Sequence, residues 1–152
     1  MDPRVLAVLG RGVVPLDTPL LRADDLGVTR GDGVFETMNV REGRAWLLEA
    51  HLRRMAASAE RADLDLPPAA ALTDLVDAAL GAWPPDREGA VKLVCTRGPE
   101  ETDGPPTVYA LVFPISLASL RQRRQGIRVA SASLGFAADG VRSEERRVGK
   151  EC

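Results

Sequence analysis

The sequence predicts an α+β fold: a small two-layer domain with an antiparallel sheet and two helices, followed by the truncated start of a second domain. Three patterns lead to this class. Short apolar runs separated by glycine-containing turns fill the first 47 residues. Two stretches with helical periodicity follow, and strand-like runs come after them. Strands on both sides of a helix pair favour a sheet with both helices on one face.

The first four strands are predicted as two pairs. Residues 4–9 and 12–16 flank one glycine-containing turn, and residues 33–39 and 44–47 flank another. Residues 24–32, between the pairs, are mostly polar and contain glycine, so we expect a loop there.

Two amphipathic helices are predicted between residues 47 and 83. In each, apolar residues recur at intervals of three or four, which places them on one helix face. Pro67-Pro68 separates the helices and Pro84-Pro85 ends the second. The two apolar stripes consist of Leu48, Leu52, Met55, Ala59 and Ala62, and of Leu72, Leu75, Val76, Ala79, Leu80 and Trp83.

The chain returns to strand patterns after the helices. Residues 90–97 and 107–115 are apolar runs joined by a loop, and a further strand is predicted to begin at 127–134. The last residues are highly charged and offer almost nothing to bury. The predicted organisation is a small N-terminal domain at 1–116, an interdomain linker at 117–125, and the truncated start of a second domain with an atypical tail at 126–152.

Composition argues against several classes of function. A formal net charge of −2 gives no reason to expect nucleic acid or an anionic membrane as partner. The first apolar run is too short to span a bilayer and lacks a cleavage site, so a cytoplasmic location is expected. Two cysteines, one histidine and no CxxC pair argue against a metal site.

The first predicted helix carries a candidate anion site. His51, Arg54 and Ser58 are spaced so that they share one helix face beside the apolar stripe. An arginine at that boundary needs an anionic partner, and a phosphate suits its planar guanidinium. The alternative is that Arg54 extends into solvent beside Arg53, and that His51 is a structural histidine.

Several segments together resemble the class IV aminotransferase family, whose members use pyridoxal 5'-phosphate (PLP). These are RGDGVFETM at 30–38, LLEAHLRR at 47–54, Ser58-Ala59, and Thr96-Arg97-Gly98 after an apolar strand. The resemblance extends from about residue 20 to about residue 136. It implies a small α+β domain, a larger second domain, PLP between them, a small-molecule substrate and a homodimer.

The resemblance also implies roles for three residues. Arg54, the last residue of the HxxR match, would bind the PLP phosphate. Arg97 would face the substrate carboxylate, and Phe35 would line the substrate pocket. Without the family match, Arg97 is interpreted as a surface charge beside a turn.

Enzymes of this family also need a lysine that bonds covalently to PLP. The chain has two lysines, Lys92 and Lys150. Strand alternation places Lys92 on the face away from Arg97, in the small domain. Lys150 lies 96 positions after Arg54, a compatible separation, but charged residues precede it where the family has apolar ones. Lys150 is therefore disfavoured, and the chain is predicted to lack the catalytic lysine.

Three functions follow from these observations. The first is an aminodeoxychorismate lyase-like enzyme, which forms 4-aminobenzoate and pyruvate from 4-amino-4-deoxychorismate. The second is a branched-chain or D-amino-acid aminotransferase of the same family. The third belongs to another class: a non-catalytic fragment or pseudoenzyme, suggested by the charged tail.

Overall fold

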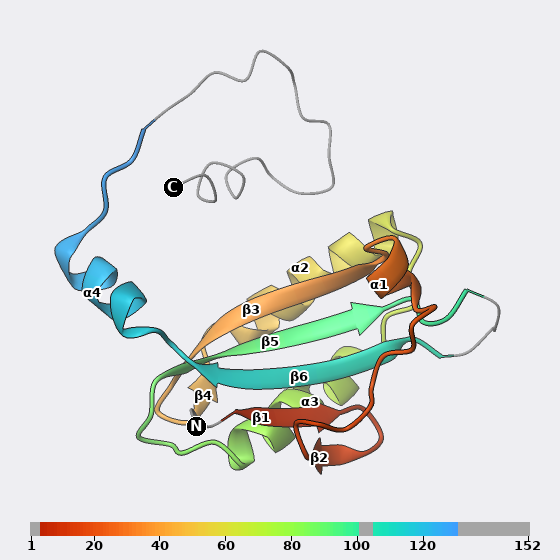
Figure 1. The fold of residues 1–152 in the computed structure, drawn as a ribbon, viewed down its shortest axis with the longest axis horizontal. Coiled ribbons are helices and arrows are strands. Elements are labelled where there is room, and N and C mark those ends of the chain that lie inside the picture. The colour runs from red at the N-terminus through yellow and green to blue at the C-terminus, as the bar shows by residue number, and fades with distance from the viewer. Residues whose placement is uncertain (1–3, 101–104, 131–152) are drawn as a thin grey trace. The chain divides into compact units, whose positions relative to one another are not determined.

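A computed structural model describes residues 4–100 and 105–130. The chain divides after Ile115 into two compact units, residues 1–115 and 116–152. The first unit contains a six-stranded antiparallel sheet with the strand order β2-β1-β6-β5-β3-β4 (Figure 1). The strands are β1 (Val5–Val8), β2 (Gly12–Val14), β3 (Gly33–Arg41), β4 (Arg44–Ala45), β5 (Gly89–Thr96) and β6 (Thr107–Pro114).

Two helices, α2 (Leu48–Arg61) and α3 (Ala69–Gly81), lie on the same face of this sheet (Figure 1). Helix α2 packs against β3, and α3 packs against β1 and β6. The α+β class with an antiparallel sheet and these two helices is confirmed. The strands and helices predicted before residue 116 agree with the structure to within a few residues at each end.

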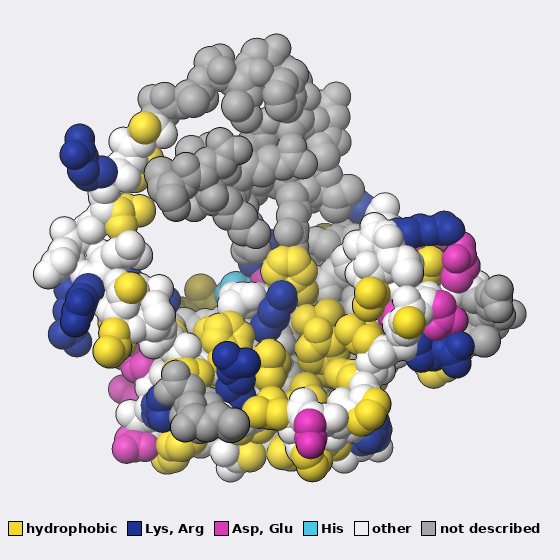
Figure 2. Space-filling model, in the orientation of Figure 1, with side chains coloured by type: hydrophobic (Ala, Val, Ile, Leu, Met, Phe, Trp, Pro, Cys, Tyr) yellow, Lys and Arg dark blue, Asp and Glu magenta, His cyan; other side chains and the backbone are white. Residues whose placement is uncertain are grey.

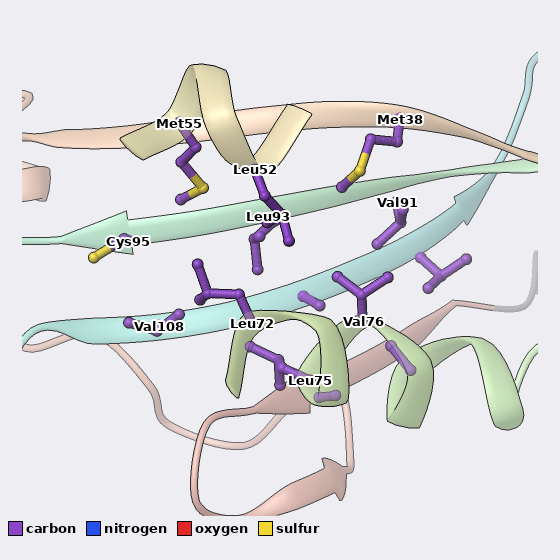
Figure 3. Close-up of a cluster of buried hydrophobic side chains, with 14 of the residues drawn as sticks. Met38, Leu52, Met55, Leu72, Leu75, Val76, Val91, Leu93, Cys95 and Val108 are labelled. Carbon is purple, nitrogen blue, oxygen red and sulfur yellow. The ribbon is translucent and has the colours of Figure 1, made fainter. Parts of the chain in front are cut away.

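The core lies between the sheet and the two helices (Figure 3). Alternate residues of β3 and β5 point into it, as the period of two in a strand requires. The helices contribute the apolar stripes recognised in the sequence. Completely buried core residues include Met38, Val91, Leu93 and Cys95 from strands, and Met55, Leu72 and Val76 from helices.

The predicted loop at 24–32 contains a one-turn helix, α1 (Leu26–Thr29). Asp25, which is 1% exposed, caps this turn by accepting a hydrogen bond from the Gly27 amide at 2.8 Å. Its other carboxylate oxygen accepts a hydrogen bond from the Thr96 hydroxyl at 2.9 Å. The segment before β3 is therefore fixed to the end of β5 instead of being an irregular loop.

In the second unit, residues 117–125, which the sequence predicts to be an interdomain linker, form helix α4 (Leu117–Gln125). Ser116 provides the N-cap by accepting a hydrogen bond from the Ser119 amide at 3.0 Å. Gly126 ends the helix with a φ of 80°. Residues 127–130 are not in a strand, and the remainder of the strand predicted at 127–134 lies outside the described residues.

Candidate functional site

The centre of β3 places a carboxylate on the helix-covered face of the sheet. Glu36 alternates with the buried Val34 and Met38, and it is directly opposite the core residue Leu93 of β5. Its side chain is only 4% exposed. An ionised carboxylate at such a position requires hydrogen-bonding partners of opposite charge.

Helix α2 supplies these partners from two positions three residues apart. Arg54 Nε donates a hydrogen bond of 2.6 Å to Glu36 Oε1, and Arg54 Nη2 donates one to Oε2. Nδ1 of His51 lies 2.8 Å from Oε2. Because an ionised carboxylate has no hydrogen to donate, Nδ1 carries the hydrogen of this bond. Glu36, His51 and Arg54 form a cluster, here called the Glu36 cluster.

The cluster favours the charged forms of Glu36 and Arg54. Burial would raise the pKa of Glu36, but hydrogen bonds from Arg54 and then His51 outweigh it, so the pKa is lowered from 4.5. The hydrogen bond to Glu36 likewise raises the pKa of Arg54. The carboxylate and the guanidinium therefore stay ionised at neutral pH.

The guanidinium of Arg54 keeps an open edge. Its Nε and Nη2 atoms face Glu36, and Nη2 also lies 3.3 Å from His51 Nδ1, while 51% of the side chain remains exposed. Within the described part of the chain, Nη1 has no hydrogen-bond partner. The two N–H donors of Nη1 suit the oxygens of a phosphate group. The residues present therefore fit a phosphate, including that of PLP.

Arg97 has a different environment at the end of β5. Its Nε and Nη2 donate to the two carboxylate oxygens of Asp32, at 2.7 and 3.3 Å. Nη1 donates to the Asp63 carbonyl at 2.8 Å, and Nη2 donates to the Ala62 carbonyl at 2.7 Å. Four of the five guanidinium N–H donors are thus used. Arg97 joins β5 to the segment before β3 and to the end of α2.

Phe35 lies on the opposite face of the sheet from the Glu36 cluster, because it is adjacent to Glu36 in β3. Figure 2 views the sheet from the side opposite α2 and α3, where hydrophobic side chains gather over the central strands. The ammonium of Lys92 lies 4.5 Å from the centre of the Phe35 ring. The structure therefore does not bring Phe35 together with Arg54.

Lys92 is the one lysine among the described residues, and in β5 it alternates with the buried Val91 and Leu93. Lys150 lies outside the described residues. Within residues 4–100 and 105–130 no group of acidic, cysteine or histidine side chains could hold a metal ion. Over the same residues no helix is long and apolar enough to cross a membrane.

The sequence-based reasoning missed two acidic partners, Glu36 and Asp32. A signal for Glu36 was present, since this glutamate occupies an inward position in an alternating strand between Val34 and Met38. No comparable pattern marks Asp32, which pairs with Arg97 only after the segment before β3 has folded onto β5.

The chain belongs to the family "Amino-transferase class IV", whose model matches residues 33–138. The resemblance stated from the motifs is thereby confirmed.

Relatives refine this picture. The chain is 43% identical, over 80% of its length, to a bifunctional aminodeoxychorismate lyase / D-amino acid transaminase of Mycobacterium tuberculosis. It is 40% identical to a hypothetical aminotransferase of the same organism solved in a PLP-bound form, with a TM-score of 0.76 over 82% of this chain and 44% of that one. A 4-amino-4-deoxychorismate lyase from Pseudomonas aeruginosa is 32% identical, with a TM-score of 0.58 over 82% of this chain and 45% of that one. The chain thus spans less than half the length of these relatives.

Proposed function

We propose that this chain forms the small domain of a PLP-dependent enzyme of the aminodeoxychorismate lyase type. Such an enzyme converts 4-amino-4-deoxychorismate to 4-aminobenzoate and pyruvate. The proposal includes a homodimer, a cytoplasmic location and a small-molecule substrate. The structural observation that carries it is the guanidinium of Arg54, which Glu36 holds so that one edge faces outward. The lyase reaction is supported by two relatives named for it, the bifunctional mycobacterial protein at 43% identity and the Pseudomonas aeruginosa lyase at 32% identity.

In this proposal Arg54 binds the phosphate of PLP. When bound, PLP supplies an electron-withdrawing ring that stabilises negative charge on the substrate carbon next to the amine. Phe35 lines the substrate pocket on the open face of the sheet. Arg97 binds the substrate carboxylate through its remaining Nη1 hydrogen, or after giving up a present partner, because its other donors are occupied.

Aminotransfer is the second candidate within the family. The mycobacterial relative is named for both activities, and a putative branched-chain-amino-acid aminotransferase of Methanocaldococcus jannaschii is 30% identical over 60% of this chain. The candidate of another class is a non-catalytic chain. The lysines favour it, because Lys92 lies away from the Glu36 cluster and charged residues precede Lys150.

The experiment compares two reactions of the purified 152-residue chain supplied with PLP. One assay follows 4-aminobenzoate formation from 4-amino-4-deoxychorismate, and the other follows amino transfer from D- and branched-chain amino acids to 2-oxo acids. Formation of 4-aminobenzoate supports the lyase. Transfer without 4-aminobenzoate supports an aminotransferase instead.

Absence of both activities, with no visible absorbance from covalently held PLP, supports the non-catalytic chain. Lys150→Ala is the matched variant. If absorbance is present in the original chain and lost in Lys150→Ala, then Lys150 is the covalent attachment point and the non-catalytic alternative is wrong.

A further inference from the structure

The contact between Glu36 and Arg54 uses one particular edge of the guanidinium. Nε and Nη2, which lie side by side, each donate to a different oxygen of the same carboxylate. His51 adds a third hydrogen bond to Oε2. The carboxylate is thereby held from two positions on α2, and the guanidinium plane is fixed relative to β3.

We propose that Glu36 is a positioning residue, which fixes the guanidinium of Arg54 so that its Nη1 hydrogens are presented to the phosphate group of a bound ligand. The inference rests on the proposed function, because it takes the ligand to be a phosphate ester. It adds a role for a residue that itself does not contact the ligand.

The physical reason is the conformational freedom of an exposed arginine. A free Arg54 side chain samples many rotamers, and binding a phosphate would require it to give up this freedom. The paired hydrogen bonds to Glu36 restrict the side chain before any ligand arrives. Glu36 itself is fixed because its side chain is 4% exposed and lies on a central strand.

A second effect of Glu36 opposes phosphate binding. The direction in which Glu36→Gln changes the affinity for a phosphate ester therefore tests the inference. The negative charge of Glu36 lies close to the bound phosphate and repels it. If charge alone governed binding, Glu36→Gln would strengthen the binding of a phosphate ester. If positioning dominates, the same substitution weakens binding, because the amide replaces one of the two acceptor oxygens with an NH2 group, which is a donor and cannot accept from Arg54.

The experiment titrates the full chain with 4-deoxypyridoxine 5'-phosphate and, separately, with 4-deoxypyridoxine. Neither compound can bond covalently to a lysine, so their difference in affinity isolates the phosphate contribution. We expect Glu36→Gln to weaken binding of the phosphate ester by about three- to tenfold and to leave 4-deoxypyridoxine unaffected. Arg54→Gln should remove the phosphate contribution. Arg53→Gln is the matched control, since Arg53 lies 3.8 Å from the exposed Glu49.

The possible results distinguish a failure of the positioning role of Glu36 from a failure of the phosphate site at Arg54. If Glu36→Gln binds the ester equally well or more tightly while Arg54→Gln loses it, the positioning role is overturned and the phosphate site stands. If the original chain does not distinguish the two compounds, or if Arg54→Gln binds like Arg53→Gln, the phosphate site itself is wrong and the inference fails with it.

A second variant tests the same point without changing the buried carboxylate. Arg54→Lys keeps the positive charge, but a single ammonium cannot pair with Glu36 and also present a planar edge. We expect it to lose nearly as much phosphate contribution as Arg54→Gln. Recovery of most of the affinity in Arg54→Lys would overturn the positioning role.

A spectroscopic readout in the free protein accompanies these titrations. The Nε–H of Arg54 should give a slowly exchanging NMR signal in the original chain, because it donates to a buried oxygen at 2.6 Å. The signal should exchange rapidly in Glu36→Gln, and the Nε–H of Arg53 should exchange rapidly in both. Rapid exchange of the Arg54 signal in the original chain would contradict the proposed positioning.

Discussion

A single glutamate in β3 (Gly33–Arg41) holds a charge where sheet and helix exclude nearly all water. An isolated carboxylate in such a place would take up a proton, because burial disfavours the ionised form. The hydrogen bonds from Arg54 and His51 reverse this preference for Glu36. Since Arg54 remains half exposed, the cluster connects the interior of the domain to its surface.

This arrangement predicts a specific dependence of stability on pH. The pKa of Glu36 is lower in the folded chain than its ordinary value of 4.5. Its ionised form therefore stabilises the fold fully above about pH 4.5, and this contribution is lost as pH falls through the lowered pKa. The difference in unfolding free energy between the original chain and Glu36→Gln should shrink towards acid pH in urea titrations. A difference that stays constant from neutral pH down to pH 3 or so would contradict the assignment.

Gly33, at the start of β3, faces backbone and tolerates no side chain. A Cβ atom there would lie 2.7 Å from the carbonyl oxygen of Cys95 and 3.2 Å from Thr96 Cα. Neither can rotate away, so Gly33→Ala should lower the unfolding free energy by about 1–3 kcal/mol. Gly81→Ala is the control, because no atom lies within 4 Å of a Cβ there. Urea midpoints that fall equally in both variants would show that the close approach is not the cause.

At the scale of elements, the start of α2 (Leu48–Arg61) is locally strained. Leu47 precedes the helix in the left-handed conformation, with φ 55° and ψ 37°. This conformation costs a residue with a Cβ atom about 1–2 kcal/mol. Leu47 is 61% exposed, so packing of its side chain offsets little of this strain energy.

Replacing Leu47 by glycine should therefore stabilise the chain. We expect Leu47→Gly to raise the unfolding free energy by about 1 kcal/mol, because glycine adopts the left-handed region freely. Ala50→Gly, at an exposed position within the same helix, should lower it by about 1 kcal/mol. Thermal unfolding of both variants measures the contrast. A loss of stability in Leu47→Gly would mean that its exposed side chain makes contacts that outweigh the strain.

Periodicity predicted the elements that bury an apolar stripe. The stripes through Leu52 and Leu72 correspond to α2 and α3, since burying such a face is what stabilises a helix in a domain. Helix α4 (Leu117–Gln125) was not predicted, because none of its residues is buried and it therefore has no apolar stripe. Its signals were local: a serine before it and a glycine after it.

In the candidate site, the sequence predicted the relative placement of helix neighbours but not the arrangement of residues across the sheet. His51 and Arg54 were placed on one face because their spacing fixes that geometry. Phe35 was predicted to line the substrate pocket, and because its neighbour Glu36 points towards the helices, Phe35 lies on the other face of the sheet from Arg54. The contact of Arg97 with Ala62 and Asp63 depends on the packing of distant segments, which no local pattern reveals.

At the scale of the whole molecule, Cys95 reports on opening of the core. It is completely buried, and burial raises its pKa to about 11. In Cys152→Ser it is the one remaining cysteine. A disulfide reagent should then label the native chain at least about a thousandfold more slowly than the unfolded chain. The rate should rise steeply with urea. Labelling at a rate independent of urea would show that the core opens locally around β5.

The position of β6 (Thr107–Pro114) in the middle of the sheet has a consequence for synthesis. It pairs with β1 on one side and with β5 on the other, although it is the last strand of the domain to be made. While a ribosome is still adding these residues, both neighbours have an unpaired edge. The nascent polypeptide must therefore keep β1 available over most of the domain's translation, and the sheet becomes continuous only when this central strand arrives.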